Sequence, residues 1–434
     1  MDKTARDELK IIIAEYEKNF KNLDYEVNEE LRKALLLAEF SQKNVIVSGS
    51  AGTGKSTFID LFKANTKKNV VVLAPTGVAA VNVKGVTIHS FFKLAHGIIN
   101  KYSVVSSNRD VVNTIDVMII DEISMVRADL MDAIDYQLRV LTGNSEIPFG
   151  GIKIVAVGDL FQLPPIVQRG SPDERYIKEN FYSPWFFSAP EIGEFTIVEL
   201  TKIYRQHDKE FTTVLNKIRI GKQTWDDLNF INKRVIKEEK FGIDYIYLST
   251  TNKVADKINK ERLDKIQKPS KHYYASVSGD FPFNSYPAPA DLELKIGAQV
   301  MILRNSPYWY NGQIGIVVGL SDFSIDVILD GIKFTMYKEE WISGDYDLKD
   351  GRVQLIEKGK FNQYPLKLAY AITIHKSQSK TYDKVYIDLG SGAFSAGQTY
   401  VALSRCKTLE GIGLKYKIEK RDIIVDKYLK EHFL

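Results

Sequence analysis

The sequence predicts an α/β protein with two units on mostly parallel β-sheets and a small antiparallel barrel inserted into the second unit. Short β-branched runs alternate with helical stretches: NVIVS, NVVVLAPT, VMIIDE, IKIVAVGD, TIVELT, DYIYLST and KVYIDLG. Such alternation is typical of parallel strands with helices on both faces. From about residue 291 to 362 the helical signals fade, and AQVMILRN, IGIVVGL, SIDVILD and KFTMYKE read as strands, with an Asn-Gly turn at 311–312.

The chain of 434 residues, with 44% hydrophobic and 26% charged residues, has room for two to four compact units. The predicted division is N-terminal helices over 1–43, a first α/β unit over 44–195, a second over 196–290 and 363–434, and the barrel over 291–362. Apolar residues at helical spacing predict the first helix, and Asn28 is the expected N-cap of the second.

Charge and cysteine content restrict the class of protein only loosely. The 59 basic and 55 acidic residues leave a net charge of +4, so a nucleic-acid site must arise from local arrangement. The single cysteine, Cys406, excludes an internal disulfide and fits a reducing compartment. Since the first residues have no apolar core and no apolar run is long enough to span a membrane, we expect a cytoplasmic protein of bacterial or phage type without a membrane partner.

The segment GSAGTGKSTF at 49–58 predicts a phosphate-binding loop, because it joins an apolar strand to a helix. Its glycines let backbone N–H groups turn inward, and the helix N-terminus attracts anions. Lys55 is expected to hold the β- and γ-phosphates, and Ser56 to ligate Mg²⁺. The predicted nucleotide contacts are Gly52, Thr53, Gly54, Lys55, Ser56 and Thr57. The alternative is an ordinary glycine-rich turn.

Three further groups supply what ATP hydrolysis needs. Asp121 and Glu122 end the strand VMIIDE, where Asp121 is expected to hold Mg²⁺ and Glu122 to polarise water; the alternative is a helix-capping pair. Asp159 and Gln162 follow IVAVG, and Gln162 is the candidate γ-phosphate sensor, unless this is simply a proline-closed loop.

Two arginines are candidates for neutralising charge in the transition state. Arg205 in LTKIYRQ and Arg405 in TYVALSRCKTLEG lie just inside the second α/β unit. Taken alone, each arginine reads as an ordinary surface ion pair. The six histidines, at 89, 96, 207, 272, 375 and 432, lack metal-ligand spacing, so Mg²⁺ with ATP is the only metal expected.

Eight segments in order resemble the petite-integration-frequency (PIF-type) family of superfamily-one DNA helicases. They are GSAGTGKST, APTGVAAVNVKGVTIHSFF, DEISMVRADLMDAIDYQLR, PFGGIKIVAVGDLFQLPP, LTKIYRQ, LKIGAQVMILRN, LKLAYAITIHKSQ and TYVALSRCKTLEG. The resemblance covers about residues 28 to 415. It implies two RecA-like domains with ATP between them, single-stranded DNA across their top, and an SH3-like barrel. The chain departs from the family at Leu31, where relatives often have glutamine, and at Ser379, where they often have glycine.

A single-stranded nucleic acid needs phosphate contacts and flat faces for its bases. In the first unit the candidates are Pro75, Thr76, Gly77, Val78, Thr87, His89, Ser90 and Phe91. In the second unit they are Thr250, Thr251, Asn252, Thr373, His375, Lys376 and Ser377. Phe91 is the expected stacking face and Phe92 the expected core residue. The segment 93–114 is too long for a plain crossover, and the resemblance makes it a small wedge insert.

The leading interpretation is an ATP-dependent DNA helicase, and the resemblance implies 5′-to-3′ movement and action on duplexes, forks and G-quadruplexes. The expected partners are single-stranded, duplex or fork DNA, and the expected state in solution is a monomer. The alternatives are a single-strand translocase that displaces proteins and a nucleotide-gated DNA clamp with little turnover. The sequence has a candidate for the general base, for the γ-phosphate sensor and for both arginines, which argues against the clamp. A nuclease would need an acidic metal cluster, and the motifs supply none apart from the ATP site.

Overall fold

The computed structural model describes residues 3–18, 20, 27–94, 97–99, 108–167, 170–190, 192–204, 208–242, 244–378 and 380–433. The chain forms two compact units. Unit 1 holds Met1–Asp159, Val167–Tyr204 and Tyr346–Ile356, and unit 2 holds Leu160–Ile166, Arg205–Asp345 and Glu357–Leu434. Among the described helices, none has the length and apolar character needed to cross a lipid bilayer.

Unit 1 contains a parallel six-stranded sheet in the order β3-β2-β4-β5-β1-β6. Its strands are β1 (Asn44–Gly49), β2 (Val70–Ala74), β3 (Val86–Thr87), β4 (Val117–Ile120), β5 (Lys153–Gly158) and β6 (Phe195–Leu200). Since all strands run the same way, their carboxyl ends meet at one edge of the sheet. That edge is where ligands bind in open α/β folds.

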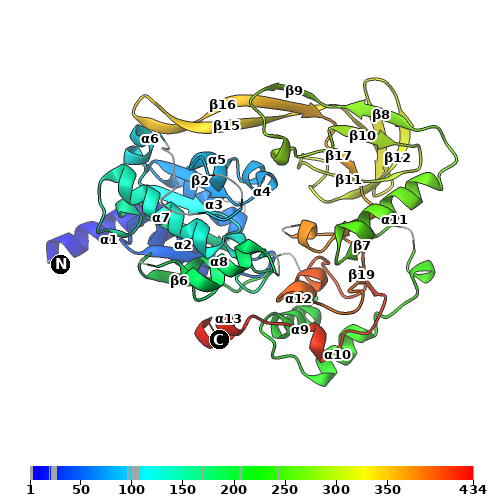
Figure 1. Ribbon diagram of the computed structural model, residues 1–434, viewed down its shortest axis with the longest axis horizontal. Helices are drawn as coiled ribbons and strands as arrows, with labels where there is room; N and C mark the ends of the chain where they lie inside the picture. The colour runs from blue at the N-terminus through cyan, green and yellow to red at the C-terminus, as the bar shows by residue number, and fades with distance from the viewer. Residues whose placement is uncertain are drawn as a thin grey trace. The chain divides into compact units, whose positions relative to one another are not determined.

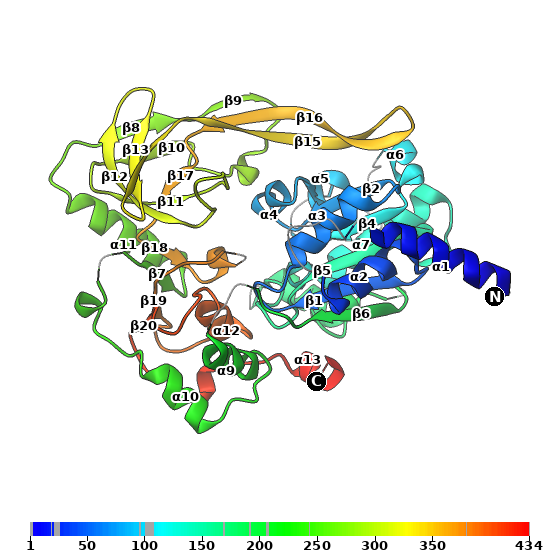
Figure 2. The ribbon, with the colours of Figure 1, turned by 180° about the vertical axis from the view of Figure 1, so that it is seen from behind.

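The helices of unit 1 are α1 (Lys3–Lys18), α2 (Glu29–Phe40), α3 (Lys55–Asn65), α4 (Gly77–Asn82), α5 (Ile88–Phe91), α6 (Arg109–Thr114), α7 (Ala128–Thr142) and α8 (Pro172–Asn180). One apolar core joins α2 and α3 to alternate residues of β1 and β5, such as Val45 and Val155. Figure 2 shows these helices against the sheet. Asn28 caps α2 as predicted, and its side chain accepts the Leu31 N–H at 2.8 Å.

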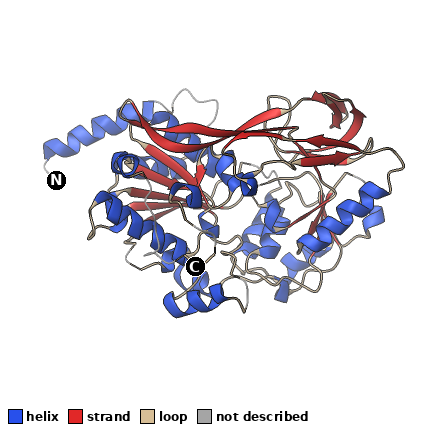
Figure 3. Cartoon of the chain, turned by 45° about the horizontal axis from the view of Figure 1, so that its top comes forward, coloured by secondary structure: helices blue, strands red, loops and turns tan. Residues whose placement is uncertain are grey.

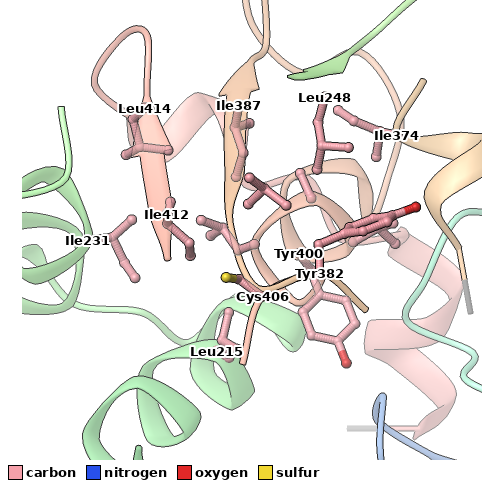
Figure 4. Packing of buried hydrophobic residues seen from close by; sticks show 14 of the residues in the cluster. Leu215, Ile231, Leu248, Ile374, Tyr382, Ile387, Tyr400, Cys406, Ile412 and Leu414 are labelled. Atoms are coloured by element: carbon pink, nitrogen blue, oxygen red, sulfur yellow. The ribbon is translucent and has the colours of Figure 1, made fainter. Parts of the chain in front are cut away.

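Unit 2 has a second parallel sheet, in the order β18-β7-β19-β20. Its strands are β7 (Ile246–Ser249), β18 (Ala371–Thr373), β19 (Val385–Asp388) and β20 (Ile412–Leu414). The helices are α9 (Lys209–Arg219), α10 (Trp225–Asn232), α11 (Asn252–Asp264), α12 (Gln398–Leu403) and α13 (Lys427–Phe433). A core of α9, α10 and α12 residues covers one face, where Leu215, Tyr382 and Cys406 meet (Figure 4). Helix α11 covers the other face through Ala255.

The barrel region of unit 2 is antiparallel (Figure 1). Five strands run in the order β14-β13-β12-β11-β17, and β8 pairs with β10. The strands are β8 (Lys271–Tyr274), β10 (Asp291–Leu294), β11 (Gln299–Ile302), β12 (Ile314–Leu320), β13 (Ile325–Leu329), β14 (Ile332–Met336) and β17 (Leu366–Leu368). Their apolar side chains form a separate core that includes Val300, Val327 and Leu366. The predicted antiparallel insert is therefore present.

A long hairpin lies between β14 and β17 in the sequence and is drawn as two extended strands in Figure 3. It consists of β15 (Glu339–Lys349) and β16 (Arg352–Gln363), and β9 (Ser276–Gly279) pairs with β16. The residues at its tip group with unit 1, where the Val72 N–H donates to the Tyr346 hydroxyl at 3.0 Å. The Tyr346 and Phe91 rings meet edge to face with centroids 6.1 Å apart. The sequence analysis missed this hairpin because its exposed strands are polar.

Two predicted boundaries are wrong. The first unit does not end at residue 195, because β6 pairs with β1 and unit 1 continues to Tyr204. The antiparallel region does not start at 291, because β8 and β9 precede it and β17 follows it. Both errors have one physical cause: pairing partners far apart in sequence determine where a strand belongs, and the local pattern does not reveal those partners.

The segment DEISMVRADLMDAIDYQLR at 121–139 contains a charge network around the half-buried Arg127. Its guanidinium donates to Asp129 (2.8 Å), to Asp173 (2.7 Å) and to the Gly97 carbonyl (2.8 Å). The Asp129 side chain is 0% exposed and also accepts the Ile99 N–H at 3.1 Å. Both carboxylates raise the pKa of Arg127. One arginine thus ties the described part of the 93–114 segment to α7 and α8.

We predict that Arg127→Met lowers the stability of unit 1 by about 3–5 kcal/mol, because it leaves Asp129 buried without its partner. The matched control is Arg32→Met, since Arg32 is 49% exposed where it pairs with Glu17. An exposed pair contributes about 0–1 kcal/mol. Urea unfolding followed by circular dichroism measures both variants, and equal losses of stability would contradict the role given to Arg127.

Candidate nucleotide and nucleic-acid sites

The loop between β1 and α3 has the backbone geometry of an anion cradle. Gly52 and Gly54 have φ of 83° and 96°, in the left-handed region that favours glycine. A Cβ on Gly49 would lie 2.4 Å from the Thr53 hydroxyl and 2.8 Å from the Leu200 carbonyl oxygen. The Thr53 hydroxyl in turn donates to the Ser50 carbonyl at 2.9 Å. The close packing of the loop therefore requires glycine at position 49.

Lys55 closes this cradle with its own side chain. Its ammonium donates to the carbonyls of Gly49 at 2.8 Å and Ser50 at 2.9 Å. A positive charge over inward-turned N–H groups at a helix N-terminus suits a polyphosphate. Ser56, the next residue, is exposed, and Thr57 is half-buried. The donor set of the loop therefore fits the nucleotide contacts predicted from the sequence.

Asp121 and Glu122 follow β4 at the same edge of the sheet as this loop. Burial and the negative charge of Glu122 raise the pKa of Asp121 to about 7, while Lys55 lowers it. Ser56 and Asp121 oxygens would suit Mg²⁺, which takes few protein ligands when phosphates and waters complete its shell. Nowhere in the described chain do three or more His, Cys, Asp or Glu side chains gather in a way that would hold a metal ion.

Glu122 has a feature that the sequence did not reveal. Its φ is 51°, which is uncommon outside glycine and costs of order 1–3 kcal/mol. Backbone strain of this kind gathers at functional sites, because the surrounding structure must hold the residue in place. With this φ, the backbone at Glu122 no longer continues the extended path of β4, so the side chain leaves in another direction. This supports Glu122 as the candidate group that polarises water.

Asp159 and Gln162 lie on opposite sides of the division between units. Asp159 follows β5 in unit 1 and is 1% exposed. Gln162 belongs to unit 2, is 5% exposed, and accepts a long 3.5 Å hydrogen bond from Gln378. A Cβ on Gly397 would lie 2.3 Å from the Gln162 carbonyl oxygen, so this loop is fixed against the start of α12. The role of Gln162 as a phosphate sensor stays a prediction.

The two predicted arginines have different outcomes. Arg205 lies outside the described residues. Arg405 is 0% exposed, and within unit 2 its guanidinium donates to the carbonyls of Val401 (2.8 Å), Ser377 (3.1 Å) and Lys380 (2.9 Å). It is therefore not the surface ion pair that the alternative interpretation required. Its described contacts hold the backbone at Ser377 and at Lys380, and its action on a phosphate stays a prediction.

In unit 1 the predicted DNA residues follow β2 and β3 at the edge that also carries the phosphate loop. The Thr76 and Thr87 hydroxyls accept the N–H groups of Ala79 (3.3 Å) and Ser90 (3.1 Å), so they cap α4 and α5. Val78 is exposed, whereas Pro75, Gly77, His89 and Ser90 are half-buried. Phe92 is buried as predicted. The exposed stacking face expected at Phe91 is wrong for this conformation, because Phe91 is 4% exposed and packs against Tyr346.

In unit 2 the two predicted DNA segments are neighbours, because β7 and β18 pair with Ser249 opposite Thr373. Thr251, Asn252 and Lys376 are exposed, while Thr250 and His375 are half-buried. The other two hydroxyls are used locally. The Thr373 hydroxyl accepts the Lys376 N–H at 3.3 Å, and the Ser377 hydroxyl donates to the Ile374 carbonyl at 2.7 Å. Thr373 and Ser377 are buried, so their direct contact with DNA is not available in this conformation.

Tyr204 is a site residue that the sequence reasoning missed. Its N–H donates to the Gly52 carbonyl at 2.9 Å, and its ring approaches Gly54. The ring is 44% exposed and Lys202 lies over it, 5.2 Å from the centroid. Its position in the segment LTKIYRQ, directly before Arg205, is the sequence feature that could have identified it. Leu31, the family departure, is 4% exposed in the core of unit 1, and Ser379 lies outside the described residues.

The segment 93–114 is described only in part, over 93–94, 97–99 and 108–114. Its last residues form α6, which Asn108 caps by accepting the Asp110 N–H at 3.1 Å. Arg109 donates to the Leu141 carbonyl at the end of α7 at 2.8 Å. The segment therefore has helical structure of its own at its end, which the sequence analysis did not expect. Its wedge role stays a prediction.

We predict that Arg405→Ala lowers the melting temperature of the protein, because it leaves the buried Ser377 and Lys380 carbonyls without a donor. Each such loss costs about 1–3 kcal/mol. Arg421→Ala is the matched control, since Arg421 is 74% exposed. Differential scanning calorimetry gives the stability, and steady-state ATPase gives turnover. An unchanged melting temperature with at least tenfold slower turnover would instead identify a transition-state arginine without an anchoring role.

Comparisons with known proteins agree with this geometry. A family model described as PIF1-like helicase matches residues 27–228. The chain is 33% identical over 422 residues to the ATP-dependent DNA helicase Pif1 of Bdellovibrio bacteriovorus, covering 93% of this chain and 90% of that protein. The crystal structure of Bacteroides sp Pif1 in complex with ADP-AlF4 matches with a TM-score of 0.87 at 39% identity, covering 94% and 96% of the two chains.

The structure of Bacteroides Pif1 bound to ssDNA matches with a TM-score of 0.69 at 39% identity and the same coverage. The chain spans 59% and 60% of the length of the PIF1 helicases of Xenopus laevis and Homo sapiens. The match to the bacterial relative exceeds 30% identity and extends over nearly the whole of both sequences, and therefore the chain belongs to the PIF1-like helicase family.

Proposed function

We propose that this protein is an ATP-dependent DNA helicase that moves along single-stranded DNA and separates duplexes and forks. One observation carries the proposal. In unit 1 the phosphate loop and the acidic pair Asp121–Glu122 lie at the same sheet edge as the turns after β2 and β3 that carry Thr76 and Thr87. Strands of one rigid sheet thus connect the nucleotide residues to the DNA residues.

The chain supplies residues for each part of ATP hydrolysis. Lys55 would neutralise charge on the β- and γ-phosphates, and Ser56 and Asp121 would hold Mg²⁺, which when bound would stabilise negative charge on the phosphate oxygens. Glu122 accepts a proton from the attacking water. Gln162 reports the γ-phosphate, and Arg205 and Arg405 are proposed to neutralise charge that develops in the transition state. The role proposed for Lys55 is supported by its place over the carbonyls of Gly49 and Ser50 in the phosphate loop.

The direction of movement, 5′ to 3′, and action on G-quadruplexes are proposed from the family resemblance. A single-strand translocase is the second candidate, because the two DNA segments of unit 2 and the ATP residues would serve it equally well. Duplex opening is the activity that separates the two. The nucleotide-gated clamp needs no transition-state groups, and the strained Glu122 favours turnover over gating.

We predict that the wild-type protein opens a duplex with a 5′ single-stranded tail in the presence of ATP and Mg²⁺, and that Lys55→Ala abolishes this activity. The variant loses the charge that holds the phosphates, whereas single-strand binding stays largely intact because it uses other residues. A strand-displacement assay and fluorescence anisotropy measure the two activities. Lys63→Ala, in the same helix, is the control for charge removal. Substantial ATP turnover by Lys55→Ala would overturn its assignment.

A duplex with a 3′ tail tests direction in the same assay. Equal opening of both substrates would overturn the 5′-to-3′ assignment. Single-strand-stimulated ATPase without any opening would favour the translocase.

We predict that replacing residues 101–110 with a short Gly-Ser linker reduces duplex opening sharply and leaves single-strand-stimulated ATPase. Separation costs about 1.4 kcal/mol per base-pair step, so a motor that follows one strand needs an obstacle to exclude the other. Replacing the exposed barrel turn at 321–324 with the same linker is the control. Wild-type opening rates in the 101–110 variant would place the wedge elsewhere in the chain.

A further inference from the structure

Three lysine side chains gather in unit 2 beside the turn His375–Ser377. Lys367 of β17 lies opposite Met301 of β11, so these two side chains leave the same face of the sheet. The Lys380 ammonium lies 3.7 Å from the Met301 sulfur. The positive charges of Lys380 and Lys376 both act on Lys367, so the three ammonium groups lie close to one another.

In the part of the chain that the structure describes, this lysine cluster (Lys367, Lys376 and Lys380) has no counter-charge in an ion pair. Across the residues that the structure describes, no Asp or Glu forms an ion pair with any of the three. Asp383, three residues beyond Lys380, is bound by Lys407 at 2.9 Å and by Tyr310 at 2.7 Å. The Met301 sulfur is only a weak acceptor. The cluster therefore presents positive charge that no carboxylate among the described residues neutralises.

Placing the lysines together in a partly buried position lowers the pKa values of Lys367 and Lys380. Burial lowers the pKa of Lys367 well below its ordinary value, and the charges of Lys380 and Lys376 lower it further. Burial lowers the pKa of Lys380 to about 8. Ammonium groups only donate hydrogen bonds, so neighbouring lysines cannot neutralise one another. A methionine at 367 would pack against Met301 without this penalty, so packing alone gives no reason for a lysine here.

The backbone holds the cluster in place before any ligand arrives. Arg405 donates to the carbonyls of Ser377 and Lys380, at 3.1 and 2.9 Å, and the Lys380 N–H donates to the Ser377 carbonyl at 3.2 Å. Lys367 is fixed by the β11–β17 ladder. Because the chain positions are rigid, a bound anion would need little reorganisation of the protein.

We propose that the lysine cluster binds a phosphate group of the single-stranded DNA backbone where the strand passes the end of β18. A phosphate offers several charged acceptor oxygens to three ammonium groups, and its negative charge would let both Lys367 and Lys380 be protonated. The choice of DNA as the source of the phosphate rests on the proposed function. It is supported by the exposed Thr251 and Asn252 at the end of the neighbouring strand β7. Free phosphate has the same chemistry and is separated from DNA by the experiment.

The first experiment measures single-strand affinity against salt concentration for Lys367→Met/Lys380→Met. Each phosphate contact on a single strand contributes about −0.7 to the slope of log K against log salt. We expect the variant to bind a poly-dT oligonucleotide about tenfold or more weakly at low salt, with a slope shallower by about 0.7 or more. Lys384→Met is the matched control, since Lys384 is exposed in the same unit, and it should keep the wild-type slope.

A stability measurement separates a ligand site from a structural role. Lys367→Met should raise the melting temperature of the free protein, because it removes a crowded cation from beside Met301. Weaker DNA binding together with higher stability supports the proposal. A lower melting temperature in Lys367→Met, or an unchanged affinity and slope in the double variant, would overturn it.

The second experiment identifies the source of the phosphate. A neutral methylphosphonate is placed at successive positions of the oligonucleotide. One position should weaken binding to the wild-type protein and have no further effect on the double variant. If no position behaves in this way, and inorganic phosphate raises the melting temperature of the wild type but not of the variant at matched ionic strength, the site takes free phosphate and the DNA assignment is overturned. This readout needs no unwinding, so a protein that fails to open duplexes would refute the proposed helicase while leaving the phosphate site intact.

Discussion

The parallel direction of the strands in unit 1 is the constraint on which the rest of the site depends. In a sheet of order β3-β2-β4-β5-β1-β6 with every pair parallel, each loop that follows a strand emerges at the same edge. Residues separated by about 100 positions, such as Lys55 and Asp159, are therefore brought to one edge, because β1 and β5 pair with Ser48 opposite Gly158. The close packing at Gly49 then fixes the phosphate loop against the end of β6.

The fold was predictable wherever a signal is local. Each β-branched run named from the sequence forms a strand, and the Asn28 cap begins α2 as expected. The phosphate loop was predictable because glycine spacing and the following helix lie within ten residues. Strand membership was less predictable. The placement of β6 in the first sheet depends on its pairing with β1, about 150 residues earlier, and a local pattern carries no information on that pairing.

Some predicted DNA-binding residues are not available to DNA in this conformation, for a related reason. A hydroxyl at the end of a strand is equally suited to a ligand and to its own backbone, and sequence alone does not choose between them. Thr373 and Ser377 satisfy neighbouring backbone groups, and Phe91 finds Tyr346, a residue more than 250 positions away. Phe91 and Phe92 carry the same local signal, so their environment could not be read from it. The strain at Glu122 is likewise visible only in its φ of 51°.

Buried cations in this molecule are handled in two different ways, and the contrast explains why the lysine cluster stands apart. Arg405 is buried and Arg127 is half-buried, and both direct their N–H groups at carboxylates or carbonyls, so the cost of desolvation is offset inside the protein. The planar guanidinium, with five donors in fixed directions, is suited to that task. Lys367 and Lys380 are half-buried next to each other and to a thioether, and their lowered pKa values show that the cost is not offset.

A protein with a spare acidic residue nearby could have neutralised these lysines, yet Asp383 is engaged by Lys407 and Tyr310 instead. Perturbed titration of this kind is concentrated at functional sites, because a group left unsatisfied in the free protein gains most when its ligand arrives. The same turn is held by Arg405, so the satisfied cation fixes the backbone on which an unsatisfied one is presented. The free energy lost by leaving Lys367 and Lys380 unpaired is then recovered on binding, and this links the stability of the free protein to its affinity for phosphate.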